Sequence, residues 1–134
     1  MNKVFSFRLN PNEDLKNEIQ NFCEKNNILA GCILSAVGSL ETIKIRLANS
    51  QNVFETTEKF EIVSVSGTVS RNGCHLHIAV ADSNGKVTGG HLMNGNKIYT
   101  TCEIIILCLK DQEFKRENDV ATGFNELKIY FKKS

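Results

Sequence analysis

From about residue 29 onward, this chain consists of short apolar or alternating runs separated by residues that favour turns. The runs cover residues 29–37, 43–47, 59–69, 74–81, 86–92, 97–109 and 126–132. A period of two is typical of β-strands. Turn signals at Asn72-Gly73, 83–85 and Asn94-Gly95 leave few residues between several runs. Because parallel strands need long crossovers, these short turns predict mostly antiparallel neighbours. Gly38-Ser39 is expected to close the first run, and the polar segment 111–125 to form a loop.

The region before these runs carries one strand pattern and one helix pattern. Residues 3–9 alternate and predict a short strand. Asn10 can cap a helix, Pro11 suits the first helical position, and Glu13 stands three residues after the cap. Apolar residues then recur at helical spacing: Leu15, Ile19, Phe22 and Cys23. We therefore predict one amphipathic N-terminal helix from about residue 11 to about residue 26, and an α+β fold built on a central, mostly antiparallel sheet.

Length and composition restrict the class of protein further. A chain of 134 residues without a Pro-, Gly- or Ser-rich linker is expected to form a single domain, residues 1–134. The net charge of +1 gives no broad basic face for nucleic acid. The five cysteines include no C-x-x-C pair, which argues against a disulfide scaffold or a zinc ribbon. No signal peptide or membrane-spanning run is recognisable, so we expect a cytoplasmic protein without membrane contact.

The three histidines of the chain all lie between residues 75 and 91. Successive side chains of a strand point to opposite faces, so His75 and His77 share one face while Leu76 and Ile78 face the core. A three-residue loop at 83–85 that ends in Gly85 would place His77 opposite His91 across a hairpin. His75 would then be a diagonal neighbour, with about 7 Å between the Cβ atoms. A bulge at Gly89-Gly90 would change this register.

Three imidazoles on one face can hold a divalent metal ion about 2.1 Å from each nitrogen and leave one coordination position open. We therefore predict a metal site formed by His75, His77 and His91. The alternative is that each histidine is an ordinary hydrogen-bonded side chain. Imidazole suits zinc, iron, copper and nickel, and zinc is the ion expected first.

Glu103 is a second candidate, because it interrupts an otherwise apolar strand. A carboxylate is costly to bury unless it is paired or ligated. Glu103 could be a fourth ligand, an acceptor for a histidine N–H, or a general base. The alternative is a cross-strand pair with a lysine or an arginine.

Three blocks of the sequence, residues 60–67, 74–82 and 85–92, resemble the plants-and-prokaryotes conserved (PPC) domain. They read Phe-Glu-Ile-Val-Ser-Val-Ser-Gly, Cys-His-Leu-His-Ile-Ala-Val-Ala-Asp and Gly-Lys-Val-Thr-Gly-Gly-His-Leu. Gly38-Ser39-Leu40 and Thr101-Cys102-Glu103 also match the pattern. The resemblance implies an α+β fold with a central antiparallel sheet, a homotrimer, and a fold similar to that of acetolactate decarboxylase, a zinc enzyme with histidine ligands. By that similarity, the three histidines map to a metal site.

The resemblance also implies an association with DNA, because plant PPC domains accompany an AT-hook. This sequence has no Arg-Gly-Arg-Pro element, and Glu58-Lys59 stand before Phe60 where the plant motif has Gly-Arg. We expect a stand-alone form without an AT-hook.

Two functions follow. The first is a homotrimeric binding or regulatory module with a three-histidine metal site and a protein or small-molecule partner, for which DNA is a further possible partner. The alternative is a zinc-dependent enzyme, similar to a lyase or decarboxylase, that acts on a small oxo- or hydroxy-acid. In the enzyme, the metal would polarise a carbonyl group or activate water, and Glu103 would shuttle a proton.

Overall fold

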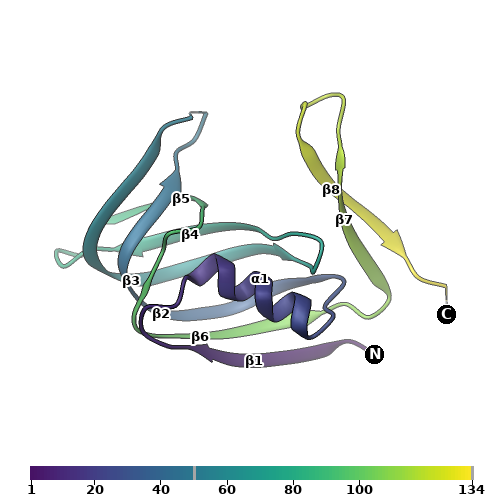
Figure 1. Cartoon of the computed structure of the whole chain (residues 1–134), viewed down its shortest axis with the longest axis horizontal. Helices are drawn as coiled ribbons and strands as arrows, with labels where there is room; N and C mark the ends of the chain where they lie inside the picture. The colour runs from purple at the N-terminus through teal and green to yellow at the C-terminus, as the bar shows by residue number, and fades with distance from the viewer. Residues whose placement is uncertain (50, 134) are drawn as a thin grey trace.

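The structure is a computed structural model that describes residues 1–49 and 51–133. All strand pairings in it are antiparallel. One sheet has the order β1-β6-β2-β3-β4-β5, and a second sheet contains β7 and β8 (Figure 1). The elements are β1 (Lys3–Leu9), α1 (Leu15–Lys25), β2 (Gly31–Arg46), β3 (Val53–Val69), β4 (His75–Ala81), β5 (Val87–Leu92), β6 (Ile98–Cys108), β7 (Gln112–Asn118) and β8 (Asn125–Phe131). The predicted α+β class with a central antiparallel sheet and one N-terminal helix is confirmed.

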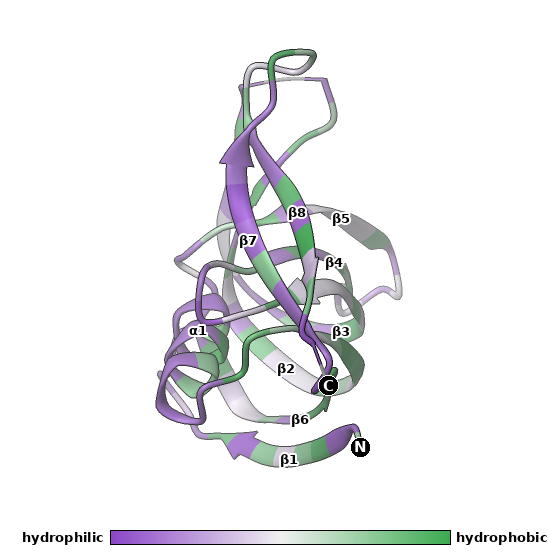
Figure 2. Cartoon of the chain, turned by 90° about the vertical axis from the view of Figure 1, so that its right-hand side faces the viewer, coloured by the Kyte–Doolittle hydropathy of each residue, from purple (hydrophilic) through white to green (hydrophobic). Residues whose placement is uncertain are grey.

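Helix α1 covers one face of the six-stranded sheet, and the main core lies between them. Its residues Leu15, Ile19 and Cys23 are completely buried. Phe22 stacks on Phe7 of β1 with ring centroids 3.8 Å apart and meets Phe5 edge-on at 5.7 Å. Burial of each large apolar side chain stabilises the fold by about 1.5–3 kcal/mol. The outward face of α1 is hydrophilic (Figure 2). Within the described part of the chain, no helix combines the length and the apolar character needed to cross a membrane.

The predicted start of the helix is wrong by four residues. Asn12 has a φ of 74°, which is incompatible with a helix, so the segment after Asn10 forms a turn instead. In that turn, the Glu13 carboxylate accepts a hydrogen bond from the Asn10 N–H at 2.7 Å. The helix begins at Leu15, and Asp14 caps it by accepting from the Asn17 N–H. Asn10 and Glu13 thus interact as a capping pair would, but they stabilise a turn that precedes the helix.

The same aspartate ties the start of the helix to the turn that precedes β6. The second carboxylate oxygen of Asp14 accepts from the N–H groups of Gly95 at 2.5 Å and Asn96 at 2.8 Å. One side chain therefore satisfies backbone donors from two elements that are about 80 residues apart in the sequence.

The prediction that Gly38-Ser39 ends a strand is wrong, because β2 continues through both residues to Arg46. A Cβ atom at Gly38 would lie 2.0 Å from the carbonyl oxygen of Thr101 in β6. The glycine is needed for the close approach of two backbones rather than for a turn. The pairing with β6 shifts in register between Gly38 and Leu40, but the strand itself continues.

The prediction of a loop at 111–125 is also wrong, because this segment contains β7 and the turn to β8. β7 has only one buried apolar residue, Phe114, so its sequence shows no strand alternation. The Phe114 N–H donates to the carbonyl oxygen of Leu29, and the Phe114 carbonyl accepts from Ser70 Oγ and Asn72 Nδ2. The hairpin therefore joins the body at its base and projects beyond it (Figures 1 and 2).

Candidate metal centre

The hairpin of β4 and β5 has the register that the sequence predicts. Gly85 has a φ of 79°, and the Asp82 N–H donates to the carbonyl oxygen of Lys86 at 2.9 Å. From this turn, pairing is continuous back to His77 opposite His91. Gly89 and Gly90 do not shift the pairing, so the predicted register is confirmed.

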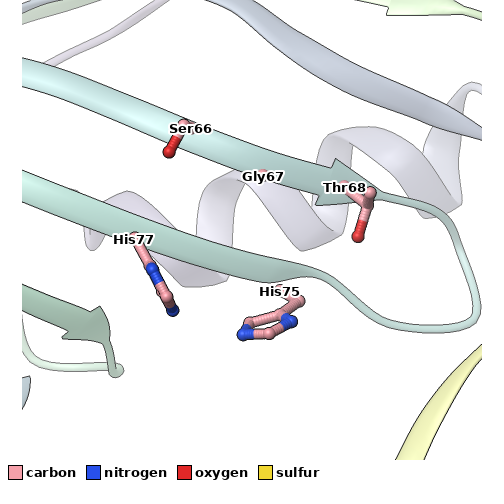
Figure 3. Close-up of a pocket in the computed structure, with 5 residues that line it drawn as sticks. All are labelled: Ser66, Gly67, Thr68, His75 and His77. Carbon is pink, nitrogen blue, oxygen red and sulfur yellow. The ribbon is translucent and has the colours of Figure 1, made fainter. Parts of the chain in front are cut away.

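The three imidazoles converge on the face of the sheet away from α1. The ring centroids are 5.1 Å apart for His75 and His77, 5.3 Å for His75 and His91, and 5.8 Å for His77 and His91. One nitrogen from each ring lies within 4.8 Å of the other two. In Figure 3, His75 and His77 point from β4 to the same side, next to Ser66 and Thr68 of β3. Small side-chain rotations would bring these nitrogens to the separation of about 3.4 Å that a tetrahedral ion requires.

A second strand fixes His91 from the other side. β5 pairs with β4 and also with the end of β2, where Arg46 stands opposite His91. A Cβ atom at Gly90 would lie 2.6 Å from the carbonyl oxygen of Arg46, and one at Gly89 would lie 2.3 Å from that of Ile78. The two glycines therefore allow backbones to approach β5 closely on both sides, and this contact brings Arg46 beside the histidines.

The electrostatic environment keeps two of the histidines neutral. Burial, and then the positive charge of Arg46, lower the pKa of His91 to about 4. Burial, and then Arg116, lower the pKa of His75. Neutral imidazole is the form that binds metal. His91 Nδ1 is buried and has no hydrogen-bond partner among the described residues. A buried nitrogen acceptor without a partner, next to two further imidazole nitrogens, fits a divalent cation.

Glu103 does not join this group of histidines. Its side chain is exposed on β6, where its neighbours in register are Arg8 of β1 and Val37 of β2. Among the described residues, the group whose donor atoms come together contains His75, His77 and His91 only. The structure therefore does not bury this carboxylate, and burial was the reason to consider it as a ligand or a base. The apolar residues around it alternate between the two faces, and the carboxylate occupies the exposed one.

A pocket of about 410 Å³ opens beside the histidines and extends to the β7–β8 hairpin. Sequence reasoning missed its charged and aromatic residues. Arg46 lies in a run that was predicted to be a strand, but the strand that would pair with it could not be predicted. Arg116, Phe124 and Glu126 lie in or next to the segment 111–125, which was predicted to be a loop. The charged, imidazole and aromatic side chains that line the pocket are Arg46, His75, His91, Arg116, Phe124 and Glu126.

Two curated relatives match 95% and 58% of this chain. The bifunctional protein GlmU of a Synechococcus strain is 43% identical over 127 residues, which is 95% of this chain. The AT-hook motif nuclear-localized protein 13 of Arabidopsis thaliana is 33% identical over 90 residues. The chain spans 20% of the length of each relative.

Solved structures match nearly the whole chain. A hypothetical protein from Salmonella has 32% identity and a TM-score of 0.94, with 98% of this chain and 95% of that chain covered. A metal-containing protein from Archaeoglobus fulgidus has 30% identity and a TM-score of 0.77, with 94% and 93% covered. A plant- and prokaryote-conserved protein from Pyrococcus horikoshii has 26% identity and a TM-score of 0.80, with 94% and 91% covered.

The predicted similarity of fold to acetolactate decarboxylase is confirmed as well. The α-acetolactate decarboxylase of Bacillus subtilis has a TM-score of 0.51 and 15% identity, with 79% of this chain and 52% of that chain covered. Identity this low shows a likeness of fold alone. The family model of the Plants and Prokaryotes Conserved (PCC) domain matches residues 1–110. This match, the relatives and the fold all agree with the resemblance read from the sequence, and the chain belongs to the Plants and Prokaryotes Conserved domain family.

Proposed function

We propose that this chain is a homotrimeric binding module, formed by a single domain of residues 1–134, that holds a divalent metal ion, zinc in the first place, on His75, His77 and His91. The observation that carries the proposal is the convergence of three imidazoles around the buried, unpartnered Nδ1 of His91. Three neutral ligands leave a coordination position for an oxygen donor from a partner molecule. The description of the Archaeoglobus fulgidus protein as metal-containing is in keeping with this proposal.

Each histidine has its own structural support. His77 and His91 face each other across the β4–β5 ladder, so their backbones are held by sheet hydrogen bonds. His75 is the first residue of β4 and directly precedes Leu76, whose buried side chain fixes that end of the strand. The ion, when bound, supplies a Lewis acid that attracts oxygen donors. The protein supplies three fixed nitrogen atoms and a nearby pocket.

Metal binding is tested by titrating the chelator-treated protein with Zn²⁺ in a calorimeter. We expect one ion per chain for the wild type, and heat changes that fall to the baseline for His77→Ala. Lys86→Ala is a matched control, because Lys86 is exposed at the turn of the same hairpin. If the wild type does not bind Zn²⁺, Ni²⁺ or Co²⁺ at micromolar concentrations, the proposed metal site is refuted.

The trimer is supported by apolar side chains on the sheet face that α1 leaves uncovered. Val4, Leu34, Val37 and Val63 are each more than half exposed. Val37 stands beside Glu103, which is itself on the face away from the core. Patches of this kind are typical of interfaces between subunits.

Light scattering after size-exclusion chromatography tests the trimer. We expect three times the mass of the chain for the wild type and a monomer for Val37→Glu. Val120→Glu is the matched control, because Val120 is almost fully exposed at the far end of the hairpin. A wild-type monomer at micromolar concentration would contradict the proposal.

The alternative function is a metal-dependent enzyme that acts on a small oxo- or hydroxy-acid. The pocket beside His75 and His91 favours it, because a small molecule could reach the ion from there. Glu103 is the proton carrier that the sequence predicts for this alternative, although its side chain does not join the histidines. Glu126 is the second candidate, since it lines the pocket together with His75. Turnover of a 2-oxo acid by the zinc-loaded protein, lost in Glu126→Gln or in Glu103→Gln, would identify the enzyme and its proton carrier.

Two finer parts of the proposal concern location and DNA. We place the protein in the cytoplasm, which agrees with five cysteines that are all free thiols. Association with DNA is a further possible activity, since the Arabidopsis relative carries the AT-hook name. It predicts an affinity that falls steeply with salt. A mobility-shift experiment at low salt tests it, and an unshifted DNA fragment would remove it.

A further inference from the structure

Two arginines flank the histidines from opposite elements, and neither belongs to the metal site itself. Arg46 is the last residue of β2 and pairs in register with His91. Arg116 lies on β7, and its guanidinium donates to Thr68 Oγ1 at 2.9 Å. Thr68 pairs in register with His75. The two arginines thus come from different sheets, and both line the pocket beside His75 and His91.

The two guanidinium groups differ in how they are held. Arg116 is partly buried and fixed by its bond to Thr68. Arg46 makes no side-chain hydrogen bond and no ion pair with any residue that the structure describes. Both line the 410 Å³ pocket, and Glu126 is the one carboxylate that lines it with them. Charge in the pocket is therefore positive before any metal ion is bound.

A divalent cation on three neutral imidazoles adds two positive charges to this region. Among the described residues that line the pocket, Glu126 is the one carboxylate that offsets these charges, so the loaded site attracts an anion. Arginine pairs with a carboxylate through two parallel hydrogen bonds, which gives both strength and orientation. The volume of the pocket lies within the range of about 300–1,000 Å³ that is usual for small-molecule sites.

We propose that the pocket binds a small carboxylic acid together with the metal, with the carboxylate on Arg46 and Arg116 and a second oxygen donor directed to the ion. The acid and the metal then bind cooperatively, because each reduces the electrostatic cost of binding the other. Phe124, which is 71% exposed beside these arginines, provides an apolar contact for the carbon skeleton of the acid. This inference rests on the proposed metal site and adds the class of ligand and the residues that select it.

The test uses the full chain loaded with Co²⁺, whose visible absorption reports on the coordination of the ion. 2-Oxoglutarate is the probe, and its neutral diamide is the control ligand. We expect a saturable spectral change with the acid and none with the diamide. The apparent Kd for the acid should weaken about tenfold or more in Arg46→Gln and in Arg116→Gln, because each loses a charge-assisted hydrogen bond.

Metal affinity measured without acid is an independent test, because the same substitution that weakens binding of the acid should strengthen binding of the metal. Removal of a nearby positive charge should strengthen Co²⁺ binding by about two- to fivefold in Arg46→Gln. Lys110→Gln, a loss of charge on an exposed residue away from the pocket, should alter neither affinity. Arg116→Lys covers the possibility that Arg116→Gln disturbs the hairpin: it keeps the charge but loses the paired hydrogen bonds, so acid binding should weaken less than in Arg116→Gln.

The outcomes separate this inference from the metal site on which it rests. If no Co²⁺ binds, the metal site fails. If Co²⁺ binds but the acid leaves the spectrum unchanged, or affects wild type and both arginine variants alike, the carboxylate site is refuted while the metal site stands. If inorganic phosphate displaces the acid and binds more tightly, the pocket selects phosphate, and the assignment to carboxylic acids is overturned.

Discussion

Replacement of His91 by glutamine should remove a specific part of the pH dependence of stability in the metal-free protein. The folded state lowers the pKa of His91 from 6.5 to about 4, mainly through burial and then through Arg46. Between these two values the unfolded chain binds a proton at His91 that the folded chain does not. Stability therefore falls as the pH drops below 6.5, and this loss levels off below pH 4.

The magnitude follows from the two pKa values. At pH 5 the linkage relation gives a loss of about 2 kcal/mol relative to pH 8. His91 is only partly buried, so solvent screening reduces the expected loss to about 1 kcal/mol. For a domain of this size, that corresponds to about 3–5 °C in Tm.

Urea denaturation at pH 8 and pH 5, in the presence of a chelator, measures this effect. Carboxylates also titrate over this interval, so the informative quantity is the difference between wild type and His91→Gln. We expect the wild type to lose about 1 kcal/mol more than the variant. Arg46→Gln should lose less than the wild type, because one cause of the lowered pKa is gone. Equal losses in wild type and His91→Gln would refute the reasoning.

Three further predictions concern the fold and the metal. Gly38→Ala should lower the free energy of unfolding by about 2–3 kcal/mol in urea denaturation, because its Cβ meets the Thr101 carbonyl oxygen; a loss below 0.5 kcal/mol would show that β2 and β6 can separate freely. Asp14→Ala should cost about 2 kcal/mol by the same measurement, since three backbone donors lose their acceptor, and an unchanged stability would contradict this role. Zn²⁺ at about 100 times its Kd should stabilise the wild type by about 2.7 kcal/mol in thermal denaturation, whereas His77→Ala should show no shift, and a shift of equal size would place the ion elsewhere.

The parts of the site that depend on local pattern could be predicted from the sequence. Strand alternation put His75 and His77 on one face, and the turn that ends in Gly85 set the register with His91. Both depend on residues that are close together in the chain. The flanking arginines could not be predicted. Arg46 lies beside the histidines because β2 pairs with β5, although Arg46 and His91 are 45 residues apart in the sequence. Arg116 lies there because the β7–β8 hairpin packs beside the sheet.

The errors in the predicted fold have the same origin. The pair Gly38-Ser39 is typical of a turn, but glycine is needed here because the backbone of Thr101, far away in the sequence, lies against it. The hairpin at 112–131 has few apolar residues because most of its side chains face solvent, so periodicity gave no signal there. The helix start failed for a local reason, since Asn12 adopts a left-handed conformation that competes with capping at Asn10.

The β7–β8 hairpin and the six-stranded sheet contribute different residues to the pocket: the hairpin supplies Arg116, and the sheet supplies the histidines. The hairpin lies beyond residues 1–110, which the family model matches, and its strands pair only with each other. Phe114 anchors it at its base, and it supplies Arg116 to the wall of the pocket. We expect that a chimera with another hairpin after residue 110 keeps the three histidines in place and changes which ligand the proposed pocket binds. Exchange of this one hairpin is then a route to new ligands for the proposed pocket that leaves the sheet with the histidines unchanged.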